Sequence, residues 1–228
     1  MTEIQEQIPA GVGIMLNSLY INPHQFTFQL PLWQEMCKEG LPIEGFCVAA
    51  GIPTTKKAIE IIDGLKAAGI RHVAFKPGSV DGIRQVVNIA AANPGFPIIL
   101  QWTGGCAGGH HSFENFYQPI LTTYHIICQY DNISFVTVAG FGFGSADDIW
   151  EYLTGDWSVE HFGVQPMPFD GVLFASHVMV AKEAPNEDSI VAAAGVEDGA
   201  WEGTYTKPTG GILTIRSELG EPIHKVAM

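Results

Sequence analysis

Apolar and polar positions follow one repeated pattern along the chain. A short, nearly continuous apolar run is followed by a longer stretch in which apolar residues recur at helical spacing. The apolar runs cover residues 12–17, 43–50, 72–76, 97–102, 133–139 and 170–176. The longer stretches between and after them cover residues 25–39, 54–68, 80–92, 113–129, 145–153 and 178–184. The pattern predicts six strands, each followed by a helix.

The stretch 54–68 shows why the longer segments are read as helices. Thr54 can cap the start of a helix with its hydroxyl. Ile59, Ile62 and Leu65 share one face at helical spacing, and Gly69 supplies a stop signal.

Strands that alternate with helices predict an α/β fold with a parallel sheet buried on both faces. Six units leave two architectures open: an open doubly wound sheet, or an incomplete (β/α)8 TIM-type barrel whose first two strands are missing. We expect residues 155–170 to form a loop. Residues 195–228 break the pattern, although 212–217 has the character of one more strand. We therefore divide the chain into a barrel-like region, 1–194, and a C-terminal segment, 195–228.

The composition indicates a folded protein. Of 228 residues, 46% are hydrophobic and only 15% are charged, which argues against a disordered chain. Eleven Lys and Arg against 24 Asp and Glu give a net charge of −13, which repels nucleic acid. The four cysteines lack metal-finger spacing, which favours a reduced, cytoplasmic protein. We see neither a signal peptide nor an apolar run long enough to cross a membrane.

The first candidate site is the loop GGCAGGHH at 104–111, directly after the run 97–102. Gly108 and Gly109 let the backbone approach a flat ligand closely, and His110 and His111 can exchange protons near neutral pH. The alternative is a flexible turn with two solvated histidines. Cys106 in this loop could act as a nucleophile with His110 as its base, which we keep as a minor hypothesis.

A second candidate is the sequence VAGFGFG at 138–144, which precedes a predicted helix. Its Gly140, Gly142 and Gly144 lie where backbone N–H groups can hold a phosphate, and a mononucleotide fits this spacing better than NAD. The alternative is an ordinary tight turn. The end of the next strand, at Ala175 and Ser176, could contribute to the same phosphate site or be a buried strand end.

Three polar residues lie near the ends of other predicted strands. Lys76 can neutralise a flavin or phosphate charge, or it can be a surface lysine with a buried stem. Asn17 and Gln101 can hydrogen-bond a ring system, or they can be turn residues.

Long stretches of the chain resemble the enoyl reductase domain of the fungal fatty acid synthase β subunit. The most specific are residues 31–53, 68–105, 108–116, 152–171 and 207–227. That domain is similar in turn to nitronate monooxygenases and to bacterial flavin-dependent enoyl reductases. The resemblance implies an FMN-binding barrel in which NADPH reduces the flavin. It also implies a trans-2-enoyl thioester on acyl carrier protein as substrate, and the rest of the synthase β and α subunits as partners.

By position, the resemblance implies that His110, with His111 beside it, is the proton donor. The resemblance also implies that the following residues contact FMN: Asn17, Lys76, Gln101, Gly108, Gly109, Gly140, Gly142, Phe143, Gly144, Ala175 and Ser176.

The chain departs from the family pattern at several places. Cys106 and His177 stand where the family has arginine, and Phe141 stands where it has serine. The family's first two strands have no counterpart. A nitronate monooxygenase-like flavoprotein and a catalytically inactive, truncated remnant are therefore the alternative hypotheses.

Overall fold

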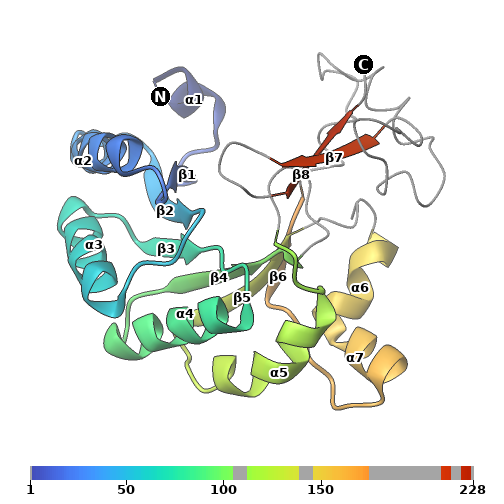
Figure 1. Ribbon diagram of the computed structural model, residues 1–228. Helices are drawn as coiled ribbons and strands as arrows, with labels where there is room; N and C mark the ends of the chain where they lie inside the picture. Colours follow the sequence, from blue (N-terminus) through green and yellow to red (C-terminus); the bar gives the residue numbers. More distant parts are fainter. Residues whose placement is uncertain (1, 105–111, 139–145, 175–211, 217–221, 227–228) are drawn as a thin grey trace. The chain divides into compact units, whose positions relative to one another are not determined.

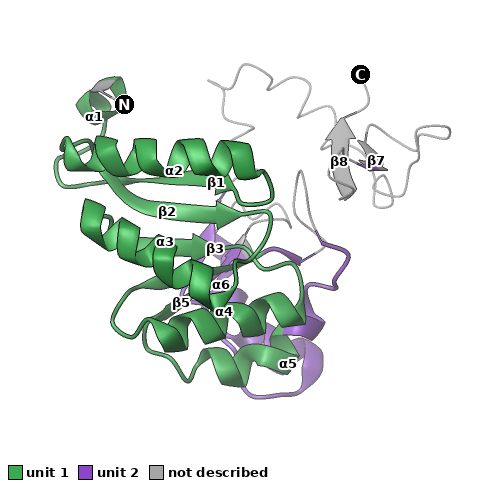
Figure 2. Cartoon of the chain, turned by 60° about the vertical axis from the view of Figure 1, so that its left-hand side comes forward, with its two compact units in different colours: residues 1–102, 120–135 green, residues 103–119, 136–228 purple. Residues whose placement is uncertain are grey.

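A computed structural model describes residues 2–104, 112–138, 146–174, 212–216 and 222–226 (Figure 1). The chain forms two compact units, shown in different colours in Figure 2. Unit 1 contains residues 1–102 and 120–135, and unit 2 contains residues 103–119 and 136–228. The predicted boundary at residue 194 lies outside the described residues.

Six strands form one sheet. They are β1 (Ile14–Leu19), β2 (Ile43–Ala49), β3 (His72–Phe75), β4 (Ile98–Trp102), β5 (Ile133–Val138) and β6 (Gly171–Leu173). All six predicted strands are confirmed, and their order in the sheet is β1-β2-β3-β4-β5-β6. The register of β1 to β4, and of β5 with β6, is parallel. A doubly wound sheet would reverse its strand order part-way, so this alternative is wrong; the sequential order is that of an incomplete barrel.

Helices α2 (Pro23–Lys38), α3 (Thr55–Ala68) and α4 (Val80–Ala92) lie on one side of strands β1 to β4 (Figures 1 and 2). Each begins at a side-chain cap that the sequence supplies: Asn22, Thr54 and Ser79 accept hydrogen bonds from backbone N–H groups of the first turn. Gly69 ends α3 in the left-handed conformation, at φ 87°. A short helix that the sequence did not predict, α1 (Thr2–Gln7), precedes β1.

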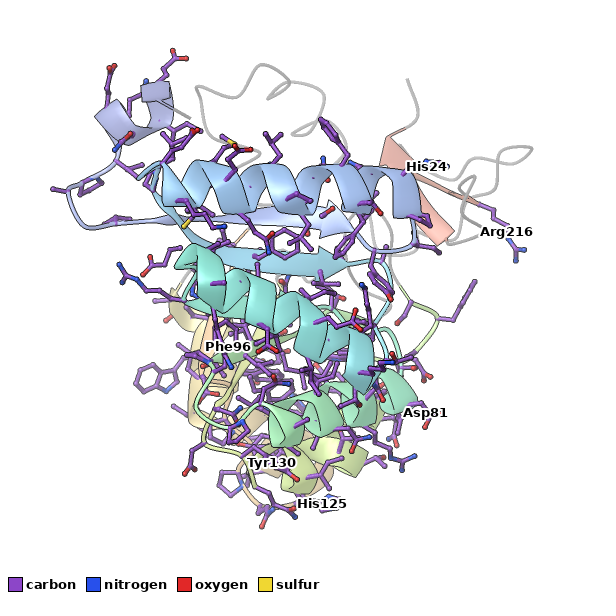
Figure 3. All side chains as sticks on the ribbon, turned by 90° about the vertical axis from the view of Figure 1, so that its left-hand side faces the viewer. His24, Asp81, Phe96, His125, Tyr130 and Arg216 are labelled. Carbon is purple, nitrogen blue, oxygen red and sulfur yellow. The ribbon has the colours of Figure 1, made fainter. Side chains whose placement is uncertain are left out.

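The core of unit 1 fills the space between these helices and the sheet. Phe46 on β2 contacts Phe26 and Trp33 of α2, with ring centroids 6.0 and 5.5 Å apart. Phe96, labelled in Figure 3, precedes β4. The centroid of its ring lies 5.2 Å from the ammonium nitrogen of Lys66 on α3. The helix side of strands β2 to β4 is therefore the hydrophobic core of the unit.

Unit 2 has a core of aromatic side chains. Trp157 is fully buried, donates its indole N–H to the Met167 carbonyl oxygen at 2.8 Å and stacks on Tyr117. It lies on α7 (Asp156–Phe162), a helix that overturns our expectation of a loop over 155–170. The helices before it are α5 (Tyr117–Ile127), whose start falls four residues later than predicted, and α6 (Ala146–Thr154).

The C-terminal segment contains an antiparallel pair. The strand expected at 212–217 is present as β7 (Ile212–Arg216), and it pairs with β8 (Pro222–Val226), which the sequence did not predict. The helix expected at 178–184 lies outside the described residues. In the part of the chain that the structure describes, no helix is both long and apolar enough to cross a membrane.

Candidate functional site

Three of the predicted site residues lie on one face of strands β1 to β4. The register pairs Asn17 with Cys47, Cys47 with Ala74 and Ala74 with Ile99, so these four side chains form one row across the sheet.

Because side chains alternate along a strand, the next row on the same face starts at Leu19 and Ala49. It continues through Lys76 and Gln101, which follow the paired residues Phe75 and Leu100. The face is the one opposite to the helices.

Beyond His72, which lies over Gly45 at the start of β3, this face of β2 and β3 carries small side chains. Cys47, Ala49 and Ala74 are 3%, 4% and 0% exposed, and they form one apolar cluster. Leu19 of β1 and Ile99 of β4 pack against the cluster from the two sides. The result is a buried apolar layer that ends, at the carboxyl end of the strands, beside Lys76 and Gln101.

Gln101 is buried, with 4% of its surface exposed, yet its amide forms no hydrogen bond to another described residue. Lys76 is half-buried, and among the residues placed by the structure no carboxylate lies within ion-pair distance of its ammonium. Both groups can therefore bind a ligand: the amide can donate and accept, and the ammonium can neutralise an anion or bind a carbonyl oxygen.

Asn17 lies in a different setting from the one expected. Strand β1 continues to Leu19, so Asn17 is one row deeper than a strand end, and its side chain is exposed. β1 is also the first strand in the sheet order. Asn17 therefore lies at the margin of the face, whereas Lys76 and Gln101 lie in adjacent strands.

Cys47 is a buried thiol on this face. Burial raises its pKa to about 11, although the nearby Lys76 ammonium acts in the opposite direction. The thiol is therefore protonated near neutral pH and is a poor nucleophile. Together strands β1 to β4 offer the polar side chains of Asn17, Lys76 and Gln101 beside a buried apolar cluster.

The other predicted residues lie outside the described part of the chain: His110, His111, Gly108, Gly109, Gly140, Gly142, Phe143, Gly144, Ala175 and Ser176, with Cys106 among them. Their assignment stays a prediction. Sequence reasoning missed the small residues Cys47, Ala49 and Ala74. The alternation of small and large residues in GFCVA, 45–49, is the signal that could have revealed them.

The comparisons with known proteins agree on one family. Residues 97–228 match the family described as fatty acid synthase subunit beta/Fas1-like, helical. The chain is 57% identical over 229 residues to Fatty acid synthase 2 of Mycosarcoma maydis, and the match covers 99% of the chain and 6% of that protein. It is 56% identical over 224 residues to the fatty acid synthase subunit beta of Schizosaccharomyces pombe, with 96% of the chain and 10% of that protein covered.

A third relative is the fatty acid synthase subunit beta of Saccharomyces cerevisiae. It is 49% identical over 228 residues, with 98% of the chain and 11% of that protein covered. The chain therefore spans between 6% and 11% of the length of these three relatives.

Proposed function

We propose, from the premise that this chain belongs to the fatty acid synthase subunit beta/Fas1-like, helical family, that it forms the enoyl reductase region of such a subunit. The reaction is the reduction of a trans-2-enoyl thioester, carried on acyl carrier protein, at the expense of NADPH. FMN, when bound, supplies the chemistry of hydride transfer from NADPH to the enoyl thioester. The fold that goes with this proposal is an incomplete (β/α)8 barrel, which the sequential strand order supports.

The observation that carries the proposal is the position of Gln101 and Lys76. They lie in neighbouring strands at the carboxyl end of a parallel sheet, the edge at which α/β folds bind their ligands. The Gln101 amide, which has no hydrogen-bond partner among the described residues, can pair with the carbonyl and imide edge of a flavin ring, which both donates and accepts. The small side chains beside it suit a flat ring.

The residues would divide the work as follows. Lys76 places positive charge at the polar edge of the ring, and Gln101 fixes its orientation by hydrogen bonds, with Asn17 at the margin. Backbone N–H groups around Gly140, Gly142, Phe143 and Gly144, with Ala175 and Ser176, would hold the phosphate. Gly108 and Gly109 would let the following loop approach the ring.

His110, with His111 beside it, would supply the proton. Hydride addition to the β-carbon moves negative charge toward the thioester carbonyl, so the α-carbon must gain a proton from a nearby acid. A histidine can serve as that acid near neutral pH. The partners in this proposal are the remaining parts of the synthase β and α subunits, in the cytoplasm.

The test uses the 228-residue chain. FMN binding is measured by flavin absorbance and by titration, for the wild type, Lys76→Met, Gln101→Leu and the exposed control Lys56→Met. We expect each site variant to weaken FMN binding by about tenfold or more, because hydrogen bonds to charged or buried groups contribute about 1.5–3 kcal/mol. Lys56→Met should bind as the wild type does.

Activity is then measured as NADPH oxidation that depends on a crotonyl thioester, with His110→Ala as the variant that should abolish it. If the chain instead consumed oxygen with alkyl nitronates and did not oxidise NADPH with the crotonyl thioester, the nitronate monooxygenase-like alternative would be favoured. A colourless chain that binds no FMN would contradict the proposal and favour the inactive remnant.

A further inference from the structure

We propose that Phe113 is a specificity-determining residue, whose ring contacts the hydrocarbon tail of the enoyl thioester and favours long tails over short ones. The inference rests on the proposed function, which supplies a substrate with such a tail and assigns the proton donor to His110. It adds to that function a contact for the part of the substrate that lies beyond the β-carbon.

The ring of Phe113 is held out into solvent. Its 77% exposure is the highest among the exposed large hydrophobic side chains in the part of the chain that the structure describes. Its neighbours Ser112, Glu114 and Asn115 are polar, so the ring is the apolar group that this turn presents. A single exposed ring is common on protein surfaces, so its meaning depends on what holds it there and on what lies beside it.

Hydrogen bonds on both sides of Phe113 fix the turn that carries it. The Ser112 hydroxyl oxygen accepts the backbone N–H of Glu114 at 3.3 Å. The Asn115 side-chain oxygen accepts the backbone N–H groups of the first two residues of α5, at 2.9 and 3.2 Å. The exposure of the ring is therefore imposed by a defined turn.

Phe116 anchors the same turn next to Gly104, two residues after the end of β4. The Phe116 side chain is 1% exposed, and its ring centroid lies 6.1 and 6.3 Å from those of Tyr152 and Phe169 in unit 2. A Cβ added to Gly104 would lie 2.9 Å from the Phe116 Cα. The two ends of the segment 104–116 therefore meet, and Phe113 is held near them, three residues before Phe116.

The covalent chain keeps Phe113 close to the proposed proton donor. His110 lies outside the described residues, but three residues of chain limit the separation of the His110 and Phe113 Cα atoms to about 11 Å. An alkyl tail with carbon–carbon bonds of about 1.5 Å in a zigzag covers that distance in roughly nine bonds. A long-chain enoyl tail is therefore long enough to reach the Phe113 ring from the reacting carbons, whereas a crotonyl group offers it only a methyl group.

Contact between the ring and the tail is favourable because both remove apolar surface from water. The gain grows with each methylene group that the ring covers, so a longer tail gains more than a short one. The turn is already fixed in the free chain, so binding does not have to order it. The expected result is a preference for long-chain substrates.

The FMN-loaded 228-residue chain tests this preference. The measurement is NADPH oxidation with the pantetheine thioesters of crotonate and trans-2-dodecenoate, the latter below its critical micelle concentration. We expect Phe113→Ala to lower the ratio of kcat/KM for the dodecenoyl substrate to kcat/KM for the crotonyl substrate by about tenfold, the order expected for the burial of one aromatic side chain. Phe113→Leu, which keeps an apolar side chain, should restore most of the ratio. Phe28→Ala, at a ring 69% exposed on α2, is the matched control and should leave the ratio unchanged.

Binding without turnover gives a second measurement. Isothermal titration calorimetry with the saturated products, butyryl and dodecanoyl pantetheine, compares their affinities for each variant. We expect Phe113→Ala to weaken dodecanoyl binding about tenfold, and Phe28→Ala to bind as the wild type does. The unfolding midpoint of Phe113→Ala should equal that of the wild type, because an exposed ring contributes little to the fold.

A wild-type ratio and wild-type dodecanoyl affinity in Phe113→Ala would overturn this inference, and crotonyl reduction by the same chain would leave the proposed function standing. Equal losses in Phe113→Ala and Phe28→Ala would show that exposed rings affect long-chain ligands nonspecifically, which would also overturn the inference. A wild-type chain that neither binds FMN nor reduces the crotonyl thioester would contradict the proposed function and this inference together.

Discussion

At the scale of single residues, Asn132 holds together the connection between α4 and β4. Its side-chain Nδ2 donates hydrogen bonds to the carbonyl oxygens of Ala90, Asn93 and Phe96, at 3.2, 3.1 and 3.3 Å. The Ala90 and Asn93 oxygens also accept from the backbone N–H groups of Asn93 and Phe96, so the Asn132 amide gives each of them a second hydrogen bond. Nothing in the sequence indicates this role, because the partners lie about forty residues earlier.

We expect Asn132→Ala to lower the free energy of unfolding by about 1–3 kcal/mol, because it removes three hydrogen bonds that each contribute about 0.5–1.5 kcal/mol. Urea unfolding at neutral pH measures this. Asn88→Ala, at an exposed position of α4, is the control and should change little. Equal effects of the two substitutions would mean that the three hydrogen bonds do not stabilise the fold.

His72 gives the fold a predictable pH dependence. Burial lowers its pKa below the usual 6.5; Glu44 raises the pKa and Arg71 lowers it further. The unfolded chain therefore binds a proton more readily than the folded chain. The stability that His72 contributes is fully present above pH 6.5 and is lost as the pH falls through its lowered folded pKa.

His72→Gln removes the titrating group. We expect its free energy of unfolding, measured in urea between about pH 5 and pH 7.5, to fall less toward acid than that of the wild type. His125→Gln, at an exposed position of α5, should retain the wild-type slope. An unchanged slope for His72→Gln would show that other groups determine the acid response.

At the scale of elements, strands were easier to predict than helices. Strands β2 to β4 are dense apolar runs because they are buried between layers, and the bounds of all six strands agree with the prediction to within a few residues. Helix α7 was missed because it lacks the signals that marked α3. It begins after Gly155, which offers no side-chain cap, and it has only seven residues. Tertiary packing of Trp157, rather than a local pattern, accounts for it.

Gly155 allows the sharp turn between α6 and α7. Its φ is +82°, and a Cβ there would lie 2.5 Å from the Met167 backbone nitrogen and 2.6 Å from that of Pro168. Gly163, at φ +64°, ends α7, and a Cβ added to it would have no other atom within 4 Å. The two glycines share the left-handed conformation and differ only in the space around them.

This difference predicts unequal costs for the same substitution. Gly163→Ala should lower the free energy of unfolding by about 1–2 kcal/mol, because alanine is strained in the left-handed backbone conformation. Gly155→Ala should cost about 1–3 kcal/mol more, because its methyl group meets backbone that cannot move aside easily. Thermal and urea unfolding of the two variants measures both costs, and equal values would show that the backbone around Met167 yields.

At the scale of the whole molecule, the sequence revealed the fold class and part of the site. Lys76 and Gln101 were found because polar residues that follow apolar runs stand out, and the sheet register brings them into neighbouring strands. Asn17 stood out for the same reason, but β1 continues past it. The small residues of β2 and β3 did not stand out, since alanine and cysteine are ordinary in a buried strand. Their meaning comes from the register across strands, which no single run of residues shows.

The free side of β1 has a consequence for handling the protein. In the described part of the chain β1 pairs with β2 alone, and it is the first strand of the sheet. Its unpaired backbone groups form a template on which another extended segment can add. Exposed Met15 on the strand and Phe28 on α2 add apolar surface nearby. Concentrated solutions of the isolated chain should therefore favour edge-to-edge assembly, and dilution should reverse its early steps.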